Sequence, residues 1–125
     1  MNIMKKSRLI LITSLILSSL LLSVPFLFAS AESYTDGSVT YTLILSGSEY
    51  SISAVSVSGT DKVDIEIPSE YNGLPVTRVR ESVFRSQSQI SSIYIPASIK
   101  QIDKYAFSSM ENLTSVEFEQ SDTTV

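Results

Sequence analysis

Two short stretches decide the fold, Ile90-Ser91-Ser92-Ile93-Tyr94-Ile95 and Leu113-Thr114-Ser115-Val116-Glu117-Phe118. In each stretch, apolar residues stand at the first, fourth and sixth positions, and the second stretch follows the first by 23 residues. Self-similarity at a fixed period of roughly 20 to 50 residues is the sequence signature of a repeat architecture. We therefore expect each stretch to form the same edge of successive, stacked units.

The same 23-residue step holds outside these two stretches, where Val79 maps onto Ile102 and Phe84 maps onto Phe107. One unit cannot bury its own apolar edge, so these positions must pack on neighbouring units. A period in this range with L-x-x-L-x-L spacing predicts a mainly β, short leucine-rich-repeat solenoid. The expected core positions are Ile67, Val79, Phe84, Ile90, Ile93, Ile95, Ile102, Phe107, Leu113, Val116 and Phe118.

Proline residues mark where the predicted strands end. Ile67-Pro68 and Ile95-Pro96 are such exits, since proline cannot donate a hydrogen bond to a strand ladder. These exits are 28 residues apart rather than 23. The additional residues are accounted for by a turn-rich insertion at Tyr71-Asn72-Gly73-Leu74-Pro75.

A β-hairpin is predicted ahead of the repeats. Residues 32–38 form a polar lead-in with a turn at Asp36-Gly37, and the apolar period then becomes two. After Ala54 the apolar phase slips by one residue, which indicates a bulge. The expected organisation is a signal peptide at 1–31, a β-hairpin cap at 32–61, a solenoid at 62–119, and a polar tail or truncation point at 120–125.

The first 31 residues have the features of a secretory signal peptide. A basic start precedes an uncharged run, rich in Leu and Ile, from residue 9 to residue 28. Ala29-Ser30-Ala31 supplies a small-x-small site, so cleavage is expected between Ala31 and Glu32. The competing interpretation is an uncleaved anchor, because about 20 apolar residues can cross a bilayer. The favoured reading is a bacterial-type leader, membrane contact only in transit, and a secreted or cell-surface protein.

Composition excludes several classes of function. The chain has no Cys, His or Trp, so thiolate, disulfide, His-zinc and Ser-His-Asp chemistry are absent from it. Residues 32–125 carry six cations and thirteen anions, a net charge of −7. An acidic surface repels phosphate, so nucleic acid is not an expected partner. We expect no catalytic residues, no metal and no cofactor, and therefore not an enzyme.

Three segments carry a family resemblance. IPSEYNGLPVTRVRESVF, IPASIKQIDKYAF and ENLTSVEF resemble the BspA-like (type 5) leucine-rich repeats of secreted and cell-surface proteins, over roughly residues 39 to 119. The resemblance implies a binding or adhesion scaffold. Arg80 and Asp103 stand where that family often has Gly, and Gln87 and Met110 stand where it often has Cys. The coil turns must therefore be made without the residue that best tolerates positive φ.

A ligand surface is predicted on the outward face of the repeat strands. The residue between the last two apolar positions of each strand faces solvent, which selects Glu66, Tyr94 and Glu117 as one ladder. Tyr is a frequent interface anchor, and two carboxylates beside it favour a basic partner. Two functions remain open: recognition or adhesion through this face, or a structural spacer or cap of a longer surface protein, with the ladder an ordinary solvated surface.

The last predicted strand has no visible cap. Leu113, Val116 and Phe118 complete it, and only polar residues follow. A solenoid needs a polar terminal cap, and an uncovered strand edge invites pairing with another chain. We therefore expect either a longer array or self-association through the coil that contains Phe118.

Overall fold

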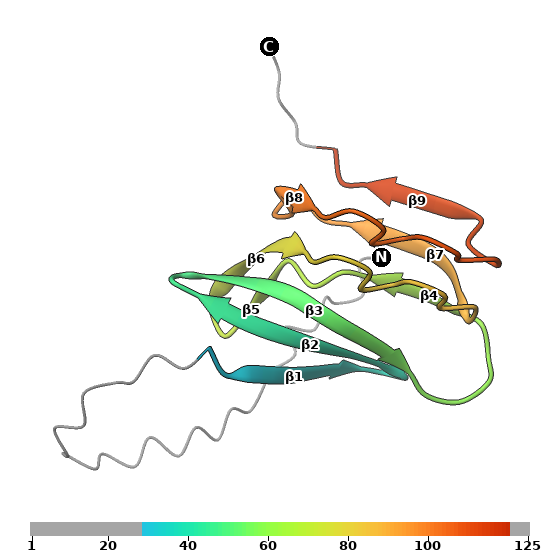
Figure 1. Ribbon diagram of the computed structural model, residues 1–125, viewed down its shortest axis with the longest axis horizontal. Helices are drawn as coiled ribbons and strands as arrows, with labels where there is room; N and C mark the ends of the chain where they lie inside the picture. The colour runs from blue at the N-terminus through green and yellow to red at the C-terminus, as the bar shows by residue number, and fades with distance from the viewer. Residues whose placement is uncertain (1–28, 121–125) are drawn as a thin grey trace, which may run out of the picture.

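The computed structural model describes residues 29–120, and within them the chain forms nine β-strands and no helix (Figure 1). The prediction of a mainly β fold is confirmed. The predicted leader, apart from its last three residues, lies outside the described part. Within that part, no helix is long and apolar enough to cross a membrane. The strands are β1 (Ala31–Asp36), β2 (Val39–Ser46), β3 (Glu49–Val57), β4 (Val63–Glu66), β5 (Glu70–Tyr71), β6 (Leu74–Val79), β7 (Ile90–Ile95), β8 (Gln101–Ile102) and β9 (Ser115–Phe118).

The N-terminal cap is a three-stranded antiparallel meander, β1-β2-β3, rather than a hairpin alone. The segment expected to be a polar lead-in forms β1, which pairs with β2 from Ala31↔Ile44 to Asp36↔Val39. Its sequence is polar, yet alternate residues are half-buried, and Tyr34 stacks on Tyr41 with ring centroids 6.1 Å apart. That side-chain pairing explains why a polar segment becomes an edge strand.

A bulge lies close to its expected place. Thr42 pairs with Ala54 and Leu43 pairs with Ile52, so Ser53 is the additional residue in β3. The Ser53 hydroxyl donates to the Thr42 carbonyl at 3.1 Å. The bulge resets the alternation, and Ile52 and Val55, three positions apart, are both buried.

The repeats stack through two parallel ladders that lie on different sides of each coil (Figure 1). One ladder is β4-β7-β9, and the other runs from β3 through β6 to β8. Successive coils pass in the same direction, so their strands pair in parallel. The cap joins the second ladder directly, because β3 pairs with β6 at Tyr50↔Val76 and Ile52↔Val79.

The five-residue insertion is a short hairpin between β5 and β6. Tyr71 pairs with Leu74 across Asn72 and Gly73, which have φ of 52° and 76°. Two consecutive residues with positive φ match a type I′ turn, for which Asn-Gly is the favoured pair. The insertion expected from the Pro68–Pro96 spacing is therefore a β-hairpin that projects from the first coil.

Ten large side chains fill the interior at less than 2% exposure, among them Tyr41, Leu43 and Phe84. The repeat positions Ile67, Val79, Phe84, Ile90, Ile93 and Ile95 are all buried. Phe107 and Leu113 are partly buried and pack against this core. Burial was wrongly expected for Ile102, Val116 and Phe118, which are 37%, 37% and 62% exposed. They occupy repeat core positions on the last described coil, where no further coil of residues 29–120 covers them.

The coil turns use positive φ at positions other than those where glycine was missed. Ser82 and Tyr105 have φ of 61° and 58°, and Ser86 and Ser109 have φ of 60° and 55°. Each pair is related by the 23-residue step, so both turns repeat from coil to coil. Arg80 and Asp103 are not among the residues with positive φ, and their lack of glycine therefore imposes no strain there.

Candidate functional site

The three outward residues expected to form a ladder lie side by side on neighbouring strands. Glu66 of β4 is in register with Tyr94 of β7, and Tyr94 is in register with Glu117 of β9. A second row, Asp64, Ser92 and Ser115, runs parallel to the first. We call these six residues the strand face.

Alternation along each strand turns these residues outward. Ile65 and Ile67 are buried on either side of exposed Glu66. Tyr94 is half-exposed between Ile93 and Ile95, which are both buried. The core therefore fixes the backbone of the strand face, and its side chains remain accessible to a partner.

The strand face is acidic. Partial burial raises the pKa of the Tyr94 hydroxyl, and the nearby carboxylates of Glu119, Glu66 and Glu117 raise this pKa further. Hydrogen bonds from the Ser92 and Ser91 hydroxyls to Asp64 Oδ1, at 2.6 and 2.9 Å, hold the pKa of Asp64 below its usual value. Tyr94 therefore stays protonated and donates from within a field of negative charge.

Glu119 belongs to this site although sequence analysis did not select it. Its backbone N–H donates to the Ile95 carbonyl at 2.8 Å, and its Oε2 accepts from the Ala97 N–H at 2.8 Å. These bonds hold Glu119 close to Tyr94. The 23-residue step offered a signal, since it aligns Glu119 with Pro96, the strand-exit residue of the preceding coil.

The chemistry available on this face is recognition of positive charge. Three carboxylates surround a phenol that can donate one hydrogen bond and provide an apolar ring, an arrangement suited to Lys or Arg side chains. Within residues 29–120, no group of three or more acidic side chains lies close enough to hold a metal ion.

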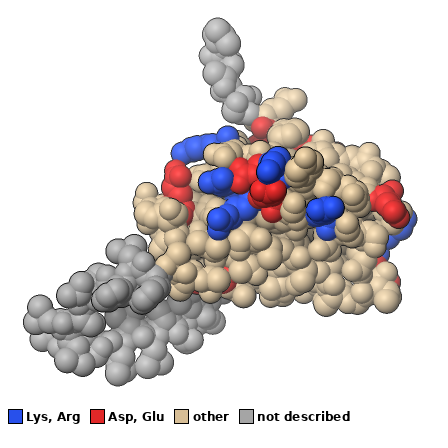
Figure 2. Space-filling model, viewed as in Figure 1, with Lys and Arg blue, Asp and Glu red and all other residues tan. Residues whose placement is uncertain are grey.

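A second charged region lies over β6 and β8 (Figure 2). Its cations are paired: Arg78 with Asp103 at 2.7 Å, Lys100 with Glu49 at 2.9 Å, and Lys104 with Glu81 at 3.6 Å. The Arg78–Asp103 pair makes two N–H to carboxylate contacts with Asp103 Oδ2, at 3.0 and 2.7 Å. A shallow polar cleft of about 280 Å³ opens beside these pairs, with buried Thr77 in its wall. Because neighbouring groups already satisfy these charges, this region is a weaker candidate than the strand face.

A family model described as "BspA type Leucine rich repeat region (6 copies)" matches residues 32–125. No curated protein sequence matches the chain significantly. Three solved structures match it with TM-scores of 0.54 to 0.55.

The first of these structures is a leucine-rich-repeat protein of T. pallidum, 23% identical over 62% of this chain and 36% of its own. Another is a leucine-rich-repeat protein of Bacteroides capillosus, 20% identical over 70% of this chain and 65% of its own. The third is a leucine-rich cell surface protein of Faecalibacterium prausnitzii, 27% identical over 73% of this chain and 24% of its own. The match therefore spans a quarter to two-thirds of each of these proteins, and the shared feature is the repeat fold.

Proposed function

The chain belongs to the BspA type leucine-rich-repeat family, and on that premise we propose that it is an exported recognition module that binds a basic protein or cell-surface ligand through its strand face. Leucine-rich-repeat folds of this kind support protein interaction, because stacked strands create a continuous surface with independently variable outward residues. The further step from interaction to adhesion is part of the proposal.

One observation carries the proposal: the register that places Tyr94 between Glu66 and Glu117. An exposed aromatic ring flanked by carboxylates can combine ring contact with charge attraction to a cationic side chain. Charge attraction also accelerates the encounter with a basic partner and repels phosphate-rich polymers. Nucleic acid is accordingly not part of the proposal.

Export is supported by the leader and by the position of its cleavage site. Cleavage between Ala31 and Glu32 would remove one residue from β1, since Ala31 begins that strand. Five residues of β1 would remain paired with β2. One of the structurally similar proteins is described as a cell surface protein, which agrees with a location outside the cell or on its surface.

The test uses a random peptide library displayed on phage and panned on the purified chain. We expect enrichment of peptides rich in Lys and Arg, whose affinity falls as the salt concentration rises. The Kd of the best peptide is then measured for Tyr94→Ala and for the double variant Glu66→Gln/Glu117→Gln. Both variants should weaken binding by at least about tenfold, because hot-spot residues carry most of the binding energy.

The matched control is the double variant Glu70→Gln/Glu111→Gln, which removes the same charge from exposed carboxylates outside the strand face. This control should retain the wild-type Kd. If the library yields no peptide that depends on the strand face, the recognition proposal fails, and the chain is better regarded as a structural spacer or cap of a longer surface protein.

A further inference from the structure

The exposed large apolar side chains of residues 29–120 all lie on one coil. Ile102, Tyr105, Val116 and Phe118 are 37%, 62%, 37% and 62% exposed. The residues that correspond to three of them one repeat earlier, Val79, Ile93 and Ile95, are at most 2% exposed. We call this surface the open end, and Figure 1 shows its strand β9 at the opposite end of the molecule from β1.

The open end is a formed surface and not a frayed segment. The Thr114 and Glu119 N–H groups donate to the Ser91 and Ile95 carbonyls at 2.8 Å each, so β9 is fastened to β7 at both ends. Asn112 Nδ2 also donates to the Ser88 carbonyl at 2.7 Å. A docking partner would therefore not need to order this coil, which lowers the cost of association.

Backbone groups at the open end are arranged to continue the ladder. In the preceding coil, the Phe84 and Ser86 N–H groups donate to the Ala106 and Ser108 carbonyls at 2.9 and 3.1 Å. The 23-residue step places the Phe107 and Ser109 N–H groups in the equivalent position, toward the open end. Any partner must supply apolar side chains together with a strand edge.

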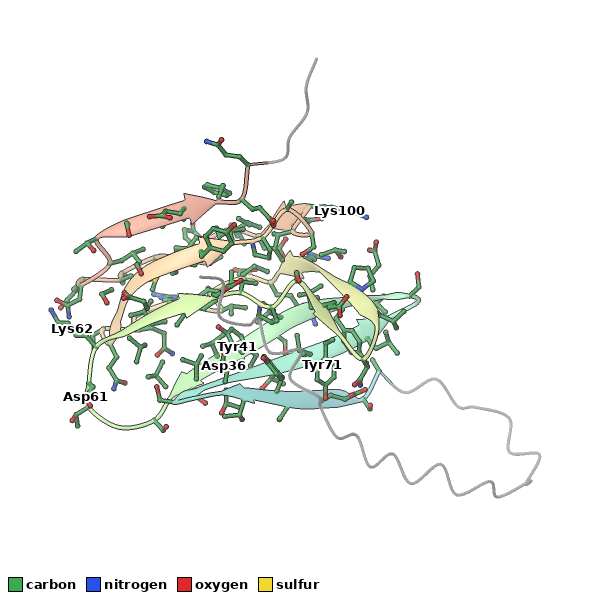
Figure 3. All side chains as sticks on the ribbon, turned by 180° about the vertical axis from the view of Figure 1, so that it is seen from behind. Asp36, Tyr41, Asp61, Lys62, Tyr71 and Lys100 are labelled. Atoms are coloured by element: carbon green, nitrogen blue, oxygen red, sulfur yellow. The ribbon has the colours of Figure 1, made fainter. Side chains whose placement is uncertain are left out.

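The other end of the stack cannot serve as that partner. Strand β3 already pairs with β6, and this covers the N-terminal side of the second ladder. Tyr41 lies between the cap and β4 (Figure 3), where its hydroxyl donates to the Glu66 carbonyl at 3.1 Å. Head-to-tail stacking of copies would have to displace these contacts, so the open end of one molecule fits the open end of another.

We propose that the open ends of two copies pair around a two-fold axis, with the two β9 strands antiparallel, to form a closed dimer. A two-fold contact uses the same surface on both copies and ends after one association step. The dimer continues the β4-β7-β9 sheet across the axis and covers Val116 and Phe118 on both copies.

Charge selects the register of this pairing. Centring the axis on Val116 places Ser115 opposite Glu117 of the second copy. Centring it on Glu117 would place two carboxylates directly opposite each other, which is destabilising. The Val116-centred register therefore brings the two Val116 side chains together on the inner face of the sheet.

The first experiment measures mass by light scattering over a range of protein concentrations, from micromolar to millimolar. Wild type should shift from monomer to dimer without forming larger species. Phe118→Lys should weaken the dimer by at least about tenfold, as expected for an apolar anchor at an interface core. Tyr105→Ser, outside the strands, should weaken it as well, which guards against misfolding of β9. Thr35→Lys, on the free edge of β1, should leave the dimer unchanged.

The second experiment tests the register, and it is simplified because the chain contains no cysteine. Val116→Cys should form an intermolecular disulfide on air oxidation, since directly opposite antiparallel residues approach closely enough for this bond. Thr35→Cys should not. A monomer at every concentration overturns the proposal, whether the introduced Val116→Cys thiol is reactive or shielded by the molecule's own chain. Species that grow beyond the dimer also overturn it, because they indicate open-ended stacking.

Discussion

Phe84 and Phe107 stack on each other from successive coils, with ring centroids 5.3 Å apart and ring planes inclined by 22°. Phe84 is fully buried, and Phe107 packs against the core from the last described coil. The pair is the aromatic column of the solenoid, and it directly joins the two coils that also share the β7-β9 ladder.

Loss of this stacking should destabilise the domain. We expect Phe107→Ala to lower the free energy of unfolding by about 3 kcal/mol, through lost burial and a cavity beside Phe84. Gln101→Ala, an exposed position on the same coil, should lower it by less than about 0.5 kcal/mol. Urea denaturation followed by circular dichroism measures both values. Equal midpoints for the two variants would contradict the repeat register.

The positive φ of Ser86 makes a prediction of the opposite sign. A non-glycine residue in the left-handed region costs about 1 kcal/mol or more, and glycine is free of this cost but loses more backbone entropy on folding. Ser86→Gly should therefore raise the unfolding free energy by about 0.5 kcal/mol.

Ser88→Gly provides the control in the same loop, because Ser88 is also exposed but does not have positive φ. This change should lower the unfolding free energy by about 0.5 kcal/mol. The two variants should then differ in the direction of their shift in melting temperature. A decrease for both would mean that the loop does not hold Ser86 in the left-handed region.

Sequence pattern was sufficient for the strand face and insufficient for the features that depend on distant partners. Period-two alternation and the 23-residue step together placed Tyr94 between Glu66 and Glu117, because both patterns are local. The strand β1 was missed because its polar residues gain their partners through folding, as Tyr34 does with Tyr41. The left-handed turn at Ser82 was also missed, since serine gives no signal of positive φ.

The Arg78–Asp103 pair makes stability depend on pH. The Arg78 guanidinium, followed by the Gln101 amide and the Arg80 charge, holds the pKa of Asp103 below its usual value of 3.8. A carboxyl with a lowered pKa in the folded state contributes stability above its unfolded pKa, and that contribution is lost as pH falls through the folded pKa. The advantage of wild type over Asp103→Asn should be complete at neutral pH and should shrink below pH 3.8.

Thermal unfolding of both proteins at a series of pH values checks this expectation. Comparing the two proteins cancels the effect of the other carboxylates, including Glu49 and Asp64, whose pKa values are also lowered. Asp61→Asn, in an exposed loop, should show no comparable convergence with wild type. A constant difference between wild type and Asp103→Asn down to the most acidic pH would exclude a role for the ionised carboxylate.

The last prediction joins processing to folding at Glu32, the expected first residue of the exported protein. Its carboxylate accepts hydrogen bonds from the Tyr50 hydroxyl at 3.1 Å and from Asn72 Nδ2 at 3.0 Å. Glu32 thus links β1 to β3 and to the turn between β5 and β6. Tyr50 also meets Tyr71 edge to face, with ring centroids 5.2 Å apart, so the link rests on a packed aromatic pair.

We expect the intact mass of the secreted protein to correspond to a chain that begins at Glu32, because the small-x-small site ends at Ala31. In that chain, Glu32→Ala should lower the unfolding free energy by about 1 kcal/mol, since two hydrogen bonds to a carboxylate are lost at a partly exposed site. Ser33→Ala, the neighbouring exposed residue, should leave it nearly unchanged. Material that retains Met1 in the membrane fraction would identify the leader as an anchor. A secreted chain that begins beyond Glu32 would instead show that β1 is held without this link.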